Sequence, residues 1–455
     1  MGASHSSTAV VTGHVAAGYE SVEEMFKKNV ETGRERDAQL CIYVEGERVV
    51  DLCGSAEGNT SYTADSLQCI FSSSKAVTAI AVAQLAQRGL INYANPVANY
   101  WPEFGQNLKA EITVADMLRH EGGIPHLDTS INLEDLLPHN LGNGNLTSLL
   151  ARQAPMFPIN TPREYHNLTA GWVINEVFRR QSPGNVTIGT WLETEISKPL
   201  NIDVYMPVPE QRMSQVQDLT AFSKNTAILQ SLIPNALGGQ VDHNIVVFIK
   251  ILKSFQKRFM EEKRGYAPDF PEMDPGVDPG EFVSSFFNCT KWRQGESPHG
   301  NIHASARGLG KLAAAMANGG TLHGVEILSP EGWNHLHGSP TVKVDGSMSG
   351  CRTEFTQSGV NMFNDYEDDI MGERIMKSGR NGFIGWMGFG GSVMQWHPRL
   401  NIGFGYTCTL LTWWDLANSK ARKLQKEAVK CAMVAKEKQE RKVDSNNNVS
   451  SEESS

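Results

Sequence analysis

Apolar positions in the first hundred residues predict an amphipathic helix, a β-hairpin and a buried helix. Residues 18–33 gather their apolar side chains on one helical face. The β-like runs 38–44 and 48–52 meet at Glu45-Gly46-Glu47, which suits a tight turn. Residues 73–88 are apolar nearly all round, which is typical of a helix inside a core, and a glycine follows where helices commonly end. Residues 1–16 lack such a pattern and are predicted to be a flexible leader.

The rest of the chain alternates between short helical and strand patterns. Further helices are predicted at 114–119, 171–180, 188–198, 244–263 and 304–318, and strands at 383–387, 391–396 and 402–410. Pro199 is expected to end the helix before it, and residues 265–280 are predicted to form an exposed loop rich in proline and glycine. The pattern predicts an α+β fold, in which an antiparallel sheet is flanked by helices and residues 92–300 form an all-helical part. Both chain ends are expected to meet in that sheet.

The C-terminal end differs from the body of the chain. Residues 17–415 are expected to form one domain, followed by a lysine-rich helix at 416–442 and a disordered Ser/Asn/Glu tail at 443–455. Such a basic helix can touch anionic lipid. The favoured interpretation is a helix that packs on the body through Leu416, Leu424 and Val429 and leaves its other face in solvent.

Composition excludes several classes of protein. The 455 residues are 40% apolar and carry a formal charge of −9, so a sizeable core is possible and a nucleic-acid binder is disfavoured. No run of about 18 apolar residues is present, so no transmembrane segment is expected. The start lacks the features of a signal peptide, and cytoplasmic localisation is expected. Gly2 lies in a loosely specified N-myristoylation pattern with no polybasic patch after it.

The cysteines favour neither a disulfide scaffold nor a structural zinc site. Their number is odd, the chain is long and no CxxC pair occurs; the seven are Cys41, Cys53, Cys69, Cys289, Cys351, Cys408 and Cys431. Free, buried thiols are expected. His120 and His126 have no HExxH context or paired carboxylate, so they are predicted to be satisfied loop histidines. We expect no metal site and no cofactor.

The motif Ser72-Ser73-Ser74-Lys75 gives the first indication of chemistry, because it opens the apolar helix. A serine and a lysine three residues apart lie on one helical face, and a buried lysine loses basicity and can act as a base. The helix N-terminus also favours a developing oxyanion. A second SxxK, at Ser254 to Lys257, stands in a polar helical pattern and is predicted to be a surface feature.

A second group of residues, Tyr165-His166-Asn167, stands just before a predicted helix. The Tyr165 phenol can act as a general base if nearby lysines lower its pKa, and the Asn167 amide can hold a substrate carbonyl. An ordinary tyrosine beside a helix-capping asparagine is the alternative.

The third group is the glycine-rich stretch from Gly385 to Ser392, which lies between two predicted strands. Glycines at this density indicate a strand approached closely by another part of the chain. Backbone N–H groups here can complete an oxyanion hole. A glycine-rich hairpin without a catalytic role is the alternative. No GxSxG elbow and no nucleotide-binding glycine motif is present.

The order and spacing of these three groups resemble the serine β-lactamase and penicillin-recognising hydrolase superfamily, over residues 20–415. Residues 112–123 and 304–320 resemble further segments of that superfamily, and Tyr165-His166 with residues 297–301 resembles its class C-like esterase branch. The resemblance implies a β-lactamase/transpeptidase-like fold in which Ser72 is acylated while Lys75 and Tyr165 share the proton transfers. It also implies that Asn167 contacts substrate and that the N–H groups of Ser72 and Phe389 form the oxyanion hole.

The chain departs from the superfamily at Trp386-Met387-Gly388, where most β-lactamases have lysine and many esterases histidine. Trp386 cannot pair with the carboxylate of a β-lactam, so the substitution favours uncharged esters. Trp386, Gly388 and Phe389 are therefore predicted to bind substrate. The leading hypothesis is a carboxylesterase acting on small ester or amide substrates through acyl-Ser72. An acyltransferase, a β-lactamase or peptidase, and a non-catalytic scaffold protein are the alternatives, and the oligomeric state is open.

Overall fold

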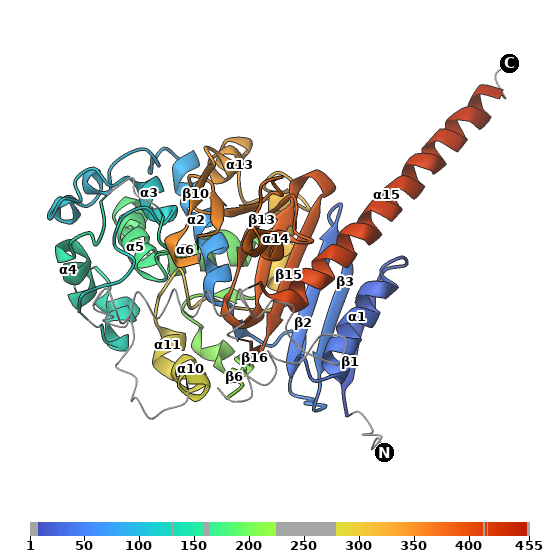
Figure 1. Cartoon of the computed structure of the whole chain (residues 1–455), viewed down its shortest axis with the longest axis horizontal. Coiled ribbons are helices and arrows are strands. Elements are labelled where there is room, and N and C mark those ends of the chain that lie inside the picture. The colour runs from blue at the N-terminus through green and yellow to red at the C-terminus, as the bar shows by residue number, and fades with distance from the viewer. Residues whose placement is uncertain are drawn as a thin grey trace.

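The computed structural model describes residues 8–129, 131–142, 144–158, 163–223, 279–348, 350–412, 415 and 417–452. Its centre is an antiparallel sheet of nine strands in the spatial order β1-β3-β2-β15-β14-β13-β12-β11-β10 (Figure 1). In that order the strands span Val10–Val15, Glu47–Ser55, Asp37–Val44, Ile402–Cys408, Val393–His397, Phe383–Met387, Asn361–Phe363, Arg352–Phe355 and Thr341–Val344. Strand β2 pairs with β15, so the two chain ends share one sheet, as predicted.

Helices cover both faces of this sheet. Helices α1 (Glu20–Glu31) and α15 (Ser419–Glu452) pack on one face, and α12 (Ala306–Ala317) packs on the other. The pleat divides β2 between the two cores, because Leu40 lies in the core under α1 and α15 while its neighbour Cys41 lies in the core under α12.

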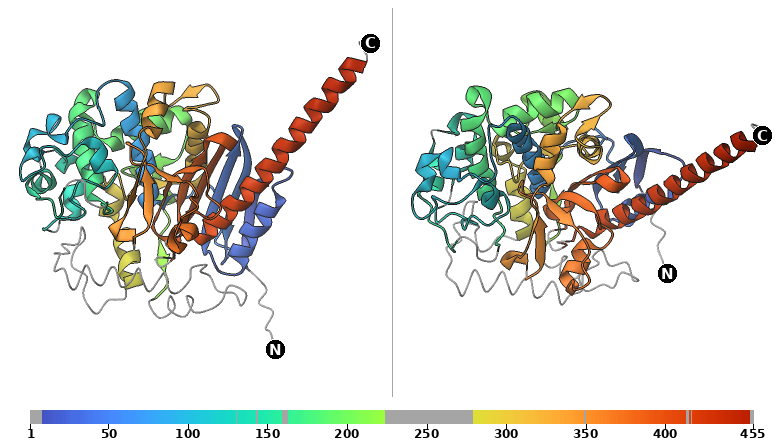
Figure 2. Two further views of the ribbon diagram at one scale, coloured as in Figure 1. Left: turned by 45° about the horizontal axis from the view of Figure 1, so that its top comes forward. Right: turned by 90° about the horizontal axis from the view of Figure 1, so that it is seen from above.

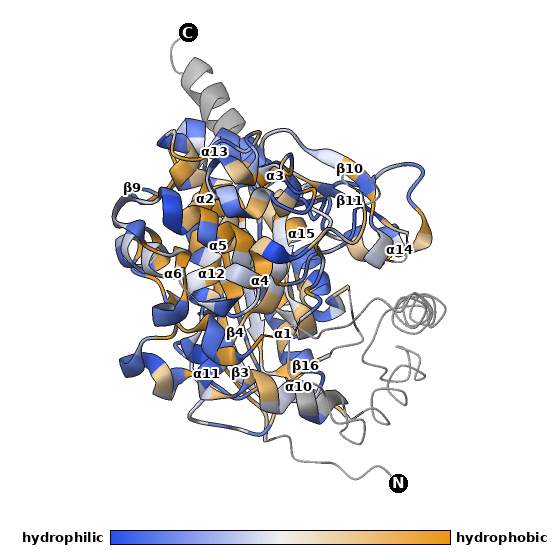
Figure 3. Ribbon diagram, turned by 90° about the vertical axis from the view of Figure 1, so that its left-hand side faces the viewer, coloured by the Kyte–Doolittle hydropathy of each residue, from blue (hydrophilic) through white to orange (hydrophobic). Residues whose placement is uncertain are grey.

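A helical part lies beside the sheet and contains α3 (Val114–Leu118), α4 (Asn145–Arg152), α5 (Thr169–Gln181) and α6 (Ile188–Trp191). Helices α10 (Pro279–Phe287) and α11 (Thr290–Gln294), yellow in Figure 2, lie next to this part, whereas α13 (Pro330–His337) packs on α2 (Ser74–Gln87). Helix α2, entered through the 3₁₀ turn η1 (Phe71–Ser73), lies between the helical part and the sheet. Every α2 residue from Ser74 to Ala86 is buried, and Figure 3 shows the apolar residues concentrated around α2, α5 and α12.

Most predicted elements are present. The amphipathic helix, the hairpin and the apolar helix correspond to α1, β2–β3 and α2, and Gly89 follows α2 with the left-handed φ of 70° expected of a helix-terminating glycine. The α+β class is confirmed. All seven cysteines are free, and six of them are buried. None of the helices in the described ranges is long and apolar enough to cross a membrane.

Predictions for the two chain ends are wrong in part. Residues 10–15 of the expected leader form β1, which pairs with β3 along its whole length, because the sheet supplies hydrogen-bond partners that a leader would lack. Helix α15 starts at Ser419 and continues to Glu452, through most of the expected disordered tail. Once Leu424 and Ala428 are buried against the body, adding residues to the helix requires only propagation, which is far easier than nucleation.

The helical part also differs in detail from its prediction. Pro199 does not end the helix: a π-helical turn η7 (Leu192–Ser197) leads into α7 (Lys198–Leu200), where Pro199 occupies the first turn and needs no N–H partner. Two short strands interrupt the region expected to be all helical, β5 (Val204–Tyr205) paired with β7 (His303–Ala304), and β6 (Thr220–Ala221) paired with β16 (Leu410–Leu411). The predicted helix at 244–263 and nearly all of the predicted loop at 265–280 lie outside the described residues.

Candidate active site

Ser72 is the one of three consecutive serines that remains accessible. It lies in η1 and is partly exposed, whereas Ser73 and Ser74 are fully buried. The Ser73 hydroxyl lies 3.1 Å from the Ser392 hydroxyl, and the Ser74 hydroxyl accepts a hydrogen bond from the Ile302 N–H. The two buried serines therefore fasten the turn to neighbouring segments, and Ser72 is left to present its Oγ.

Lys75 lies one helical turn beyond Ser72, and its ammonium group has no carboxylate partner among the described residues. Its Nζ lies 3.2 Å from Ser72 Oγ and donates to the backbone carbonyls of Asn167, at 2.9 Å, and His299, at 3.0 Å. The side chain is 3% exposed, and this burial lowers the pKa of Lys75 well below its usual 10.5. The site therefore favours the neutral amine.

The contacts of Lys75 also suit the neutral amine geometrically. A neutral amine has two N–H groups and one lone pair. The carbonyls of Asn167 and His299 can take both N–H groups, which leaves the lone pair for the third neighbour, the Ser72 hydroxyl. Lys75 is thus placed to accept the proton of Ser72.

Tyr165 makes the second contact to the Ser72 hydroxyl. Its Oη lies 2.5 Å from Ser72 Oγ, and Lys75 Nζ lies 4.7 Å from the centre of its ring. Burial raises the pKa of the Tyr165 phenol, and the hydrogen bond between this phenol and the Ser72 hydroxyl only partly opposes the rise. Lys75 does not offset this rise, because burial disfavours the charge of the lysine as well. Tyr165 stays protonated and can donate a proton.

Asn167 stands beside the same group with an exposed side chain. Its backbone carbonyl is one of the two that hold Lys75. The predicted contact of its amide with substrate remains a prediction, and the exposure leaves that amide accessible.

Trp386 packs beside Tyr165 and Lys75. Its indole is 5% exposed, donates from Nε1 to the Gly359 carbonyl at 2.7 Å, and stacks on Phe355 with ring centres 5.2 Å apart. Its ring lies 5.9 Å from that of Tyr165 and 5.5 Å from Lys75 Nζ. This position of β13 therefore carries a largely buried indole and no cation.

Gly388 allows the end of β13 to touch the nucleophile turn, which confirms the close approach predicted from the glycines. A Cβ added here would lie 2.2 Å from the Ile70 carbonyl oxygen and 2.1 Å from Ser392 Oγ. Phe389 follows and packs edge-on against Phe71, with ring centres 5.6 Å apart. The backbone of residue 388 thus packs against Ile70, just before the turn that carries Ser72, and an oxyanion hole formed by the N–H groups of Ser72 and Phe389 remains a prediction.

Two buried histidines beside the catalytic group were not predicted as part of it. His120 packs against Tyr165, with ring centres 4.7 Å apart, and its Nδ1 accepts the His166 N–H at 3.2 Å. Its Nε2 has no hydrogen-bond partner within the described part of the chain, so the prediction of a satisfied histidine holds for one ring nitrogen only. His299 contributes its carbonyl to Lys75. Such a backbone contact depends on chain geometry and leaves no residue-type signal in the sequence.

A buried ion network positions the segment that carries Tyr165. Arg163 is fully buried, pairs with Glu121 at 2.7 Å and donates to the Thr353 carbonyl of β11 at 2.7 Å. Lys343 of β10 pairs with the same glutamate at 2.6 Å. Since breaking a buried ion pair leaves an uncompensated charge, this network fixes the segment firmly against the sheet.

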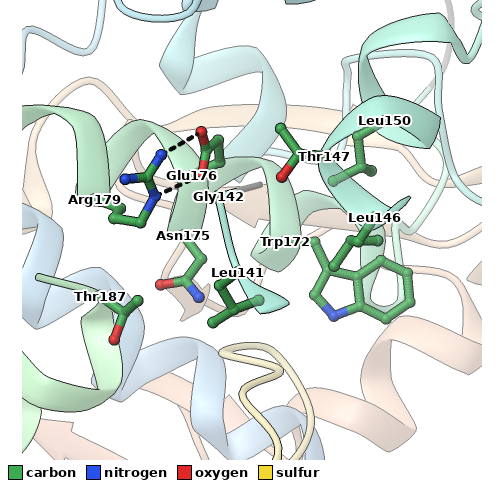
Figure 4. A pocket seen from close by; sticks show the side chains of 10 residues that line it. All are labelled: Leu141, Gly142, Leu146, Thr147, Leu150, Trp172, Asn175, Glu176, Arg179 and Thr187. Atoms are coloured by element: carbon green, nitrogen blue, oxygen red, sulfur yellow. Dashed lines mark hydrogen bonds and ion pairs between the residues drawn. The ribbon is translucent and has the colours of Figure 1, made fainter. Parts of the chain in front are cut away.

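The small pocket in Figure 4 is separate from this site. It lies between α4 and α5, and an Arg179–Glu176 ion pair of 2.9 Å forms part of its wall. None of the predicted site residues lines it. Across the described ranges, no cluster of three or more His, Cys, Asp or Glu side chains is placed to hold a metal ion.

Comparison with known proteins gives one family. A family model described as Beta-lactamase matches residues 22–428. "Esterase/beta-lactamase LipL" of Mycobacterium tuberculosis is 30% identical over 308 residues, which are 64% of this chain and 61% of that protein. The chain therefore spans less than two thirds of this curated relative.

Two solved structures share the fold. A penicillin-binding protein homolog from Caulobacter crescentus and a family VIII carboxylesterase each superpose with a TM-score of 0.69 at 24% identity, covering 93% of this chain and 100% of theirs. At this identity the likeness concerns the fold alone. The matched span of the family model includes Ser72, Lys75, Tyr165 and the end of β13, and by that match the chain belongs to the Beta-lactamase family.

Proposed function

We propose that this protein is a serine-dependent acyl hydrolase, a carboxylesterase that works through an acyl-Ser72 intermediate. The observation that carries the proposal is the position of Ser72 Oγ, within 3.2 Å of Lys75 Nζ and 2.5 Å of Tyr165 Oη. An activated serine needs a base within hydrogen-bond reach, and here the adjacent lysine is desolvated while the adjacent phenol remains protonated.

In the proposed acylation step, neutral Lys75 takes the proton of Ser72 as Oγ attacks the ester carbonyl. The carbonyl oxygen becomes an oxyanion, which the N–H groups of Ser72 and Phe389 stabilise. Tyr165 donates its proton to the departing alkoxide and is reprotonated from Lys75. The products of this step are the free alcohol and acyl-Ser72.

In the proposed deacylation step, Lys75 is neutral again and accepts a proton from water, directly or through Tyr165. The water oxygen attacks the acyl carbonyl. As the bond between the acyl carbon and Ser72 Oγ breaks, Lys75 returns its proton to Oγ. This returns the serine and releases a carboxylic acid. An alcohol or amine in place of the water would make the reaction an acyl transfer.

The proposed substrates are small, uncharged esters, with amides as a second class. The relatives' names include both esterase and β-lactamase, so the choice rests on Trp386. A β-lactam carboxylate that loses water without gaining a cation is costly to bind, whereas an ester needs no such partner. The largely buried indole supplies no such cation at this position.

A fluorophosphonate tests the catalytic serine directly. Intact-mass analysis should show one adduct on the wild-type protein and on Ser254→Ala, which removes the serine of the second SxxK. Ser72→Ala should show none. An adduct that persists in Ser72→Ala would overturn the assignment, and a folded wild-type protein without an adduct would favour the non-catalytic scaffold.

Substrate class is tested by comparing kcat/KM for p-nitrophenyl butyrate and nitrocefin on one preparation. The proposal expects the ester to be much the better substrate. A higher value for nitrocefin would favour a β-lactamase, and faster turnover on adding an alcohol acceptor would favour an acyltransferase.

A further inference from the structure

The turn at the end of β13 is closed by a side chain from another part of the chain. Within the turn, the Gly388 N–H donates to the Ser392 carbonyl at 2.8 Å and the Gly391 N–H donates to the Gly388 carbonyl at 3.3 Å. Asn418 Nδ2 donates to both of these carbonyls, at 3.0 Å each. The amide therefore joins the two ends of the turn.

Asn418 occupies a position whose side chain usually caps the helix that follows. It directly precedes α15, and an asparagine there normally accepts the first free N–H groups of the helix. In this protein Asp415 takes that role, because its carboxylate accepts the Ser419 N–H at 2.8 Å and the Ser419 hydroxyl at 3.0 Å. The Asn418 side chain is thus free to bind the turn, although it is 4% exposed.

The orientation of the Asn418 amide follows from its partners. Both are carbonyl oxygens, which only accept, so the nitrogen rather than the oxygen must face them. The buried guanidinium of Arg380 holds the residue in place by donating to the Ala417 carbonyl at 2.8 Å and to the Asn418 carbonyl at 3.5 Å.

The peptide bond between Gly388 and Phe389 connects the Asn418 amide to the active site. The Gly388 carbonyl and the Phe389 N–H belong to the same trans peptide, so they point in opposite directions. A donor that fixes the carbonyl direction also fixes the N–H direction. Asn418 and the Gly391 N–H are the two donors to this carbonyl, and rotation of the peptide would break both hydrogen bonds.

We propose that Asn418 is a positioning residue of the active site, which orients the Phe389 N–H toward the acyl carbonyl on Ser72. The proposal rests on the proposed function only for the role of that N–H as an oxyanion-hole donor. The geometric part, that the amide holds the peptide plane, is independent of any activity. The start of the C-terminal helix thereby becomes part of the catalytic apparatus.

Asn418→Asp is the sharpest variant, because it keeps the size of the side chain and replaces the donor with an oxygen that repels both carbonyls. Loss of one oxyanion donor lowers kcat by about 10²–10³, so Asn418→Asp should lower kcat for p-nitrophenyl butyrate by about 10²-fold. Asn418→Ala should lose about tenfold, near the value of one hydrogen bond. KM should change by less than about threefold in both variants, since the Phe389 N–H would bind the carbonyl oxygen mainly in the transition state.

Gln425→Leu is the matched control. Gln425 is also buried in α15, where it donates to the Gln395 side chain at 2.6 Å and accepts from Arg380 Nε at 2.9 Å, and it has no hydrogen bond to the turn among the described residues. The Arg380 contacts to the carbonyls of residues 417 and 418 come from the other two guanidinium nitrogens and do not involve Gln425. Its loss should lower the melting temperature with little change in kcat. Phenylboronic acid adds a readout that general destabilisation does not change, because its serine adduct places an oxygen in the oxyanion hole. Its inhibition constant should rise in the Asn418 variants by the factor by which kcat/KM falls.

Amide hydrogen exchange separates this inference from the proposed function. Exchange of the Gly388 and Gly391 N–H groups should be about tenfold faster in Asn418→Ala than in Gln425→Leu, whether or not the protein hydrolyses esters. A wild-type protein without esterase or fluorophosphonate reactivity, in which exchange still responds, would contradict the function and support the geometry. An active wild-type protein whose Asn418→Asp and Asn418→Ala variants keep both kcat and exchange would overturn the inference.

Discussion

Two buried lysines in this protein make similar backbone hydrogen bonds but differ in the side chain that each contacts. Lys75 and Lys109 are both buried, and each donates to two backbone carbonyls: Lys75 to those of Asn167 and His299, Lys109 to those of Ala151 and Gln153. Burial lowers the pKa of both, that of Lys109 to about 8. An altered lysine pKa is therefore not by itself the mark of a catalytic site.

The difference lies in the third partner. Lys75 lies 3.2 Å from a hydroxyl that also contacts Tyr165. Lys109 instead lies over the ring of Phe104, 4.9 Å from its centre, and has no hydroxyl partner among the described residues. The first arrangement can move a proton to or from a nucleophile. The second can only hold the helical part together.

Replacing each lysine in turn should show the largest difference in kcat between the two sites. Lys75→Ala should lower kcat by about 10³–10⁴, because it removes the base proposed for both steps. Lys109→Met should leave kcat within about twofold and alter only stability. Ester hydrolysis and thermal unfolding measured on both variants check this. Equal kcat losses in the two would mean that burial alone accounts for the effect of Lys75.

Tyr165→Phe should give the next largest effect, since it removes the proton donor and leaves Lys75 in place. A loss in kcat of about 10²–10³ is expected. The double variant Lys75→Ala/Tyr165→Phe should lose much less than the product of the single losses, because both act on the same hydroxyl. Strictly multiplicative losses would show that the two side chains work independently.

Lys109 should also contribute to the pH dependence of stability, and this effect should be smaller than the changes in kcat. Its pKa is about 8 in the folded protein and near 10.5 when unfolded, so between these values the unfolded state binds more protons. Stability should therefore rise as pH increases from about 8 to 10.5, and this rise should be weaker in Lys109→Met. Thermal unfolding of both proteins across that range measures the difference. Parallel curves would contradict the assigned shift.

Trp386→Lys should have the smallest effect on activity. It places a second ammonium group near Lys75. A second ammonium near Lys75 should favour anionic substrates, so the ratio of kcat/KM for nitrocefin to that for p-nitrophenyl butyrate should rise by a few-fold. It should also make protonation of Lys75 harder, since a like charge disfavours the charged form. A lower ratio would mean that the indole is not what limits β-lactam binding.

Local sequence signals predicted much of the fold and the first half of the site. Ser72 and Lys75 are one helical turn apart, so their proximity follows from the helix alone. Their contact with Tyr165 depends on the packing of distant segments, and the family resemblance anticipated it. The two carbonyls that hold Lys75 and the Asn418 amide on the β13 turn have no such signal, because they depend on tertiary geometry.

The errors have the same origin. Strand β1 forms because β3 is available to pair with it, and the C-terminal helix persists because its first turns are buried by the body. The same holds for Tyr165 and Lys75, because burial disfavours the charges of both groups. In each case the surroundings, rather than the local residue type, decide the outcome.

The central claim is that neutral Lys75 is the base that activates Ser72, with Tyr165 as the proton donor. The most direct test is the second-order rate of Ser72 phosphonylation by a fluorophosphonate, in which Oγ displaces fluoride from phosphorus, measured against pH in the wild-type protein and in Tyr165→Phe. The rate should rise with pH through one ionisation well below 10.5, the usual pKa of lysine, because only the neutral amine accepts the proton. That ionisation should remain in Tyr165→Phe. Its disappearance in that variant would contradict the account and identify the phenol as the base.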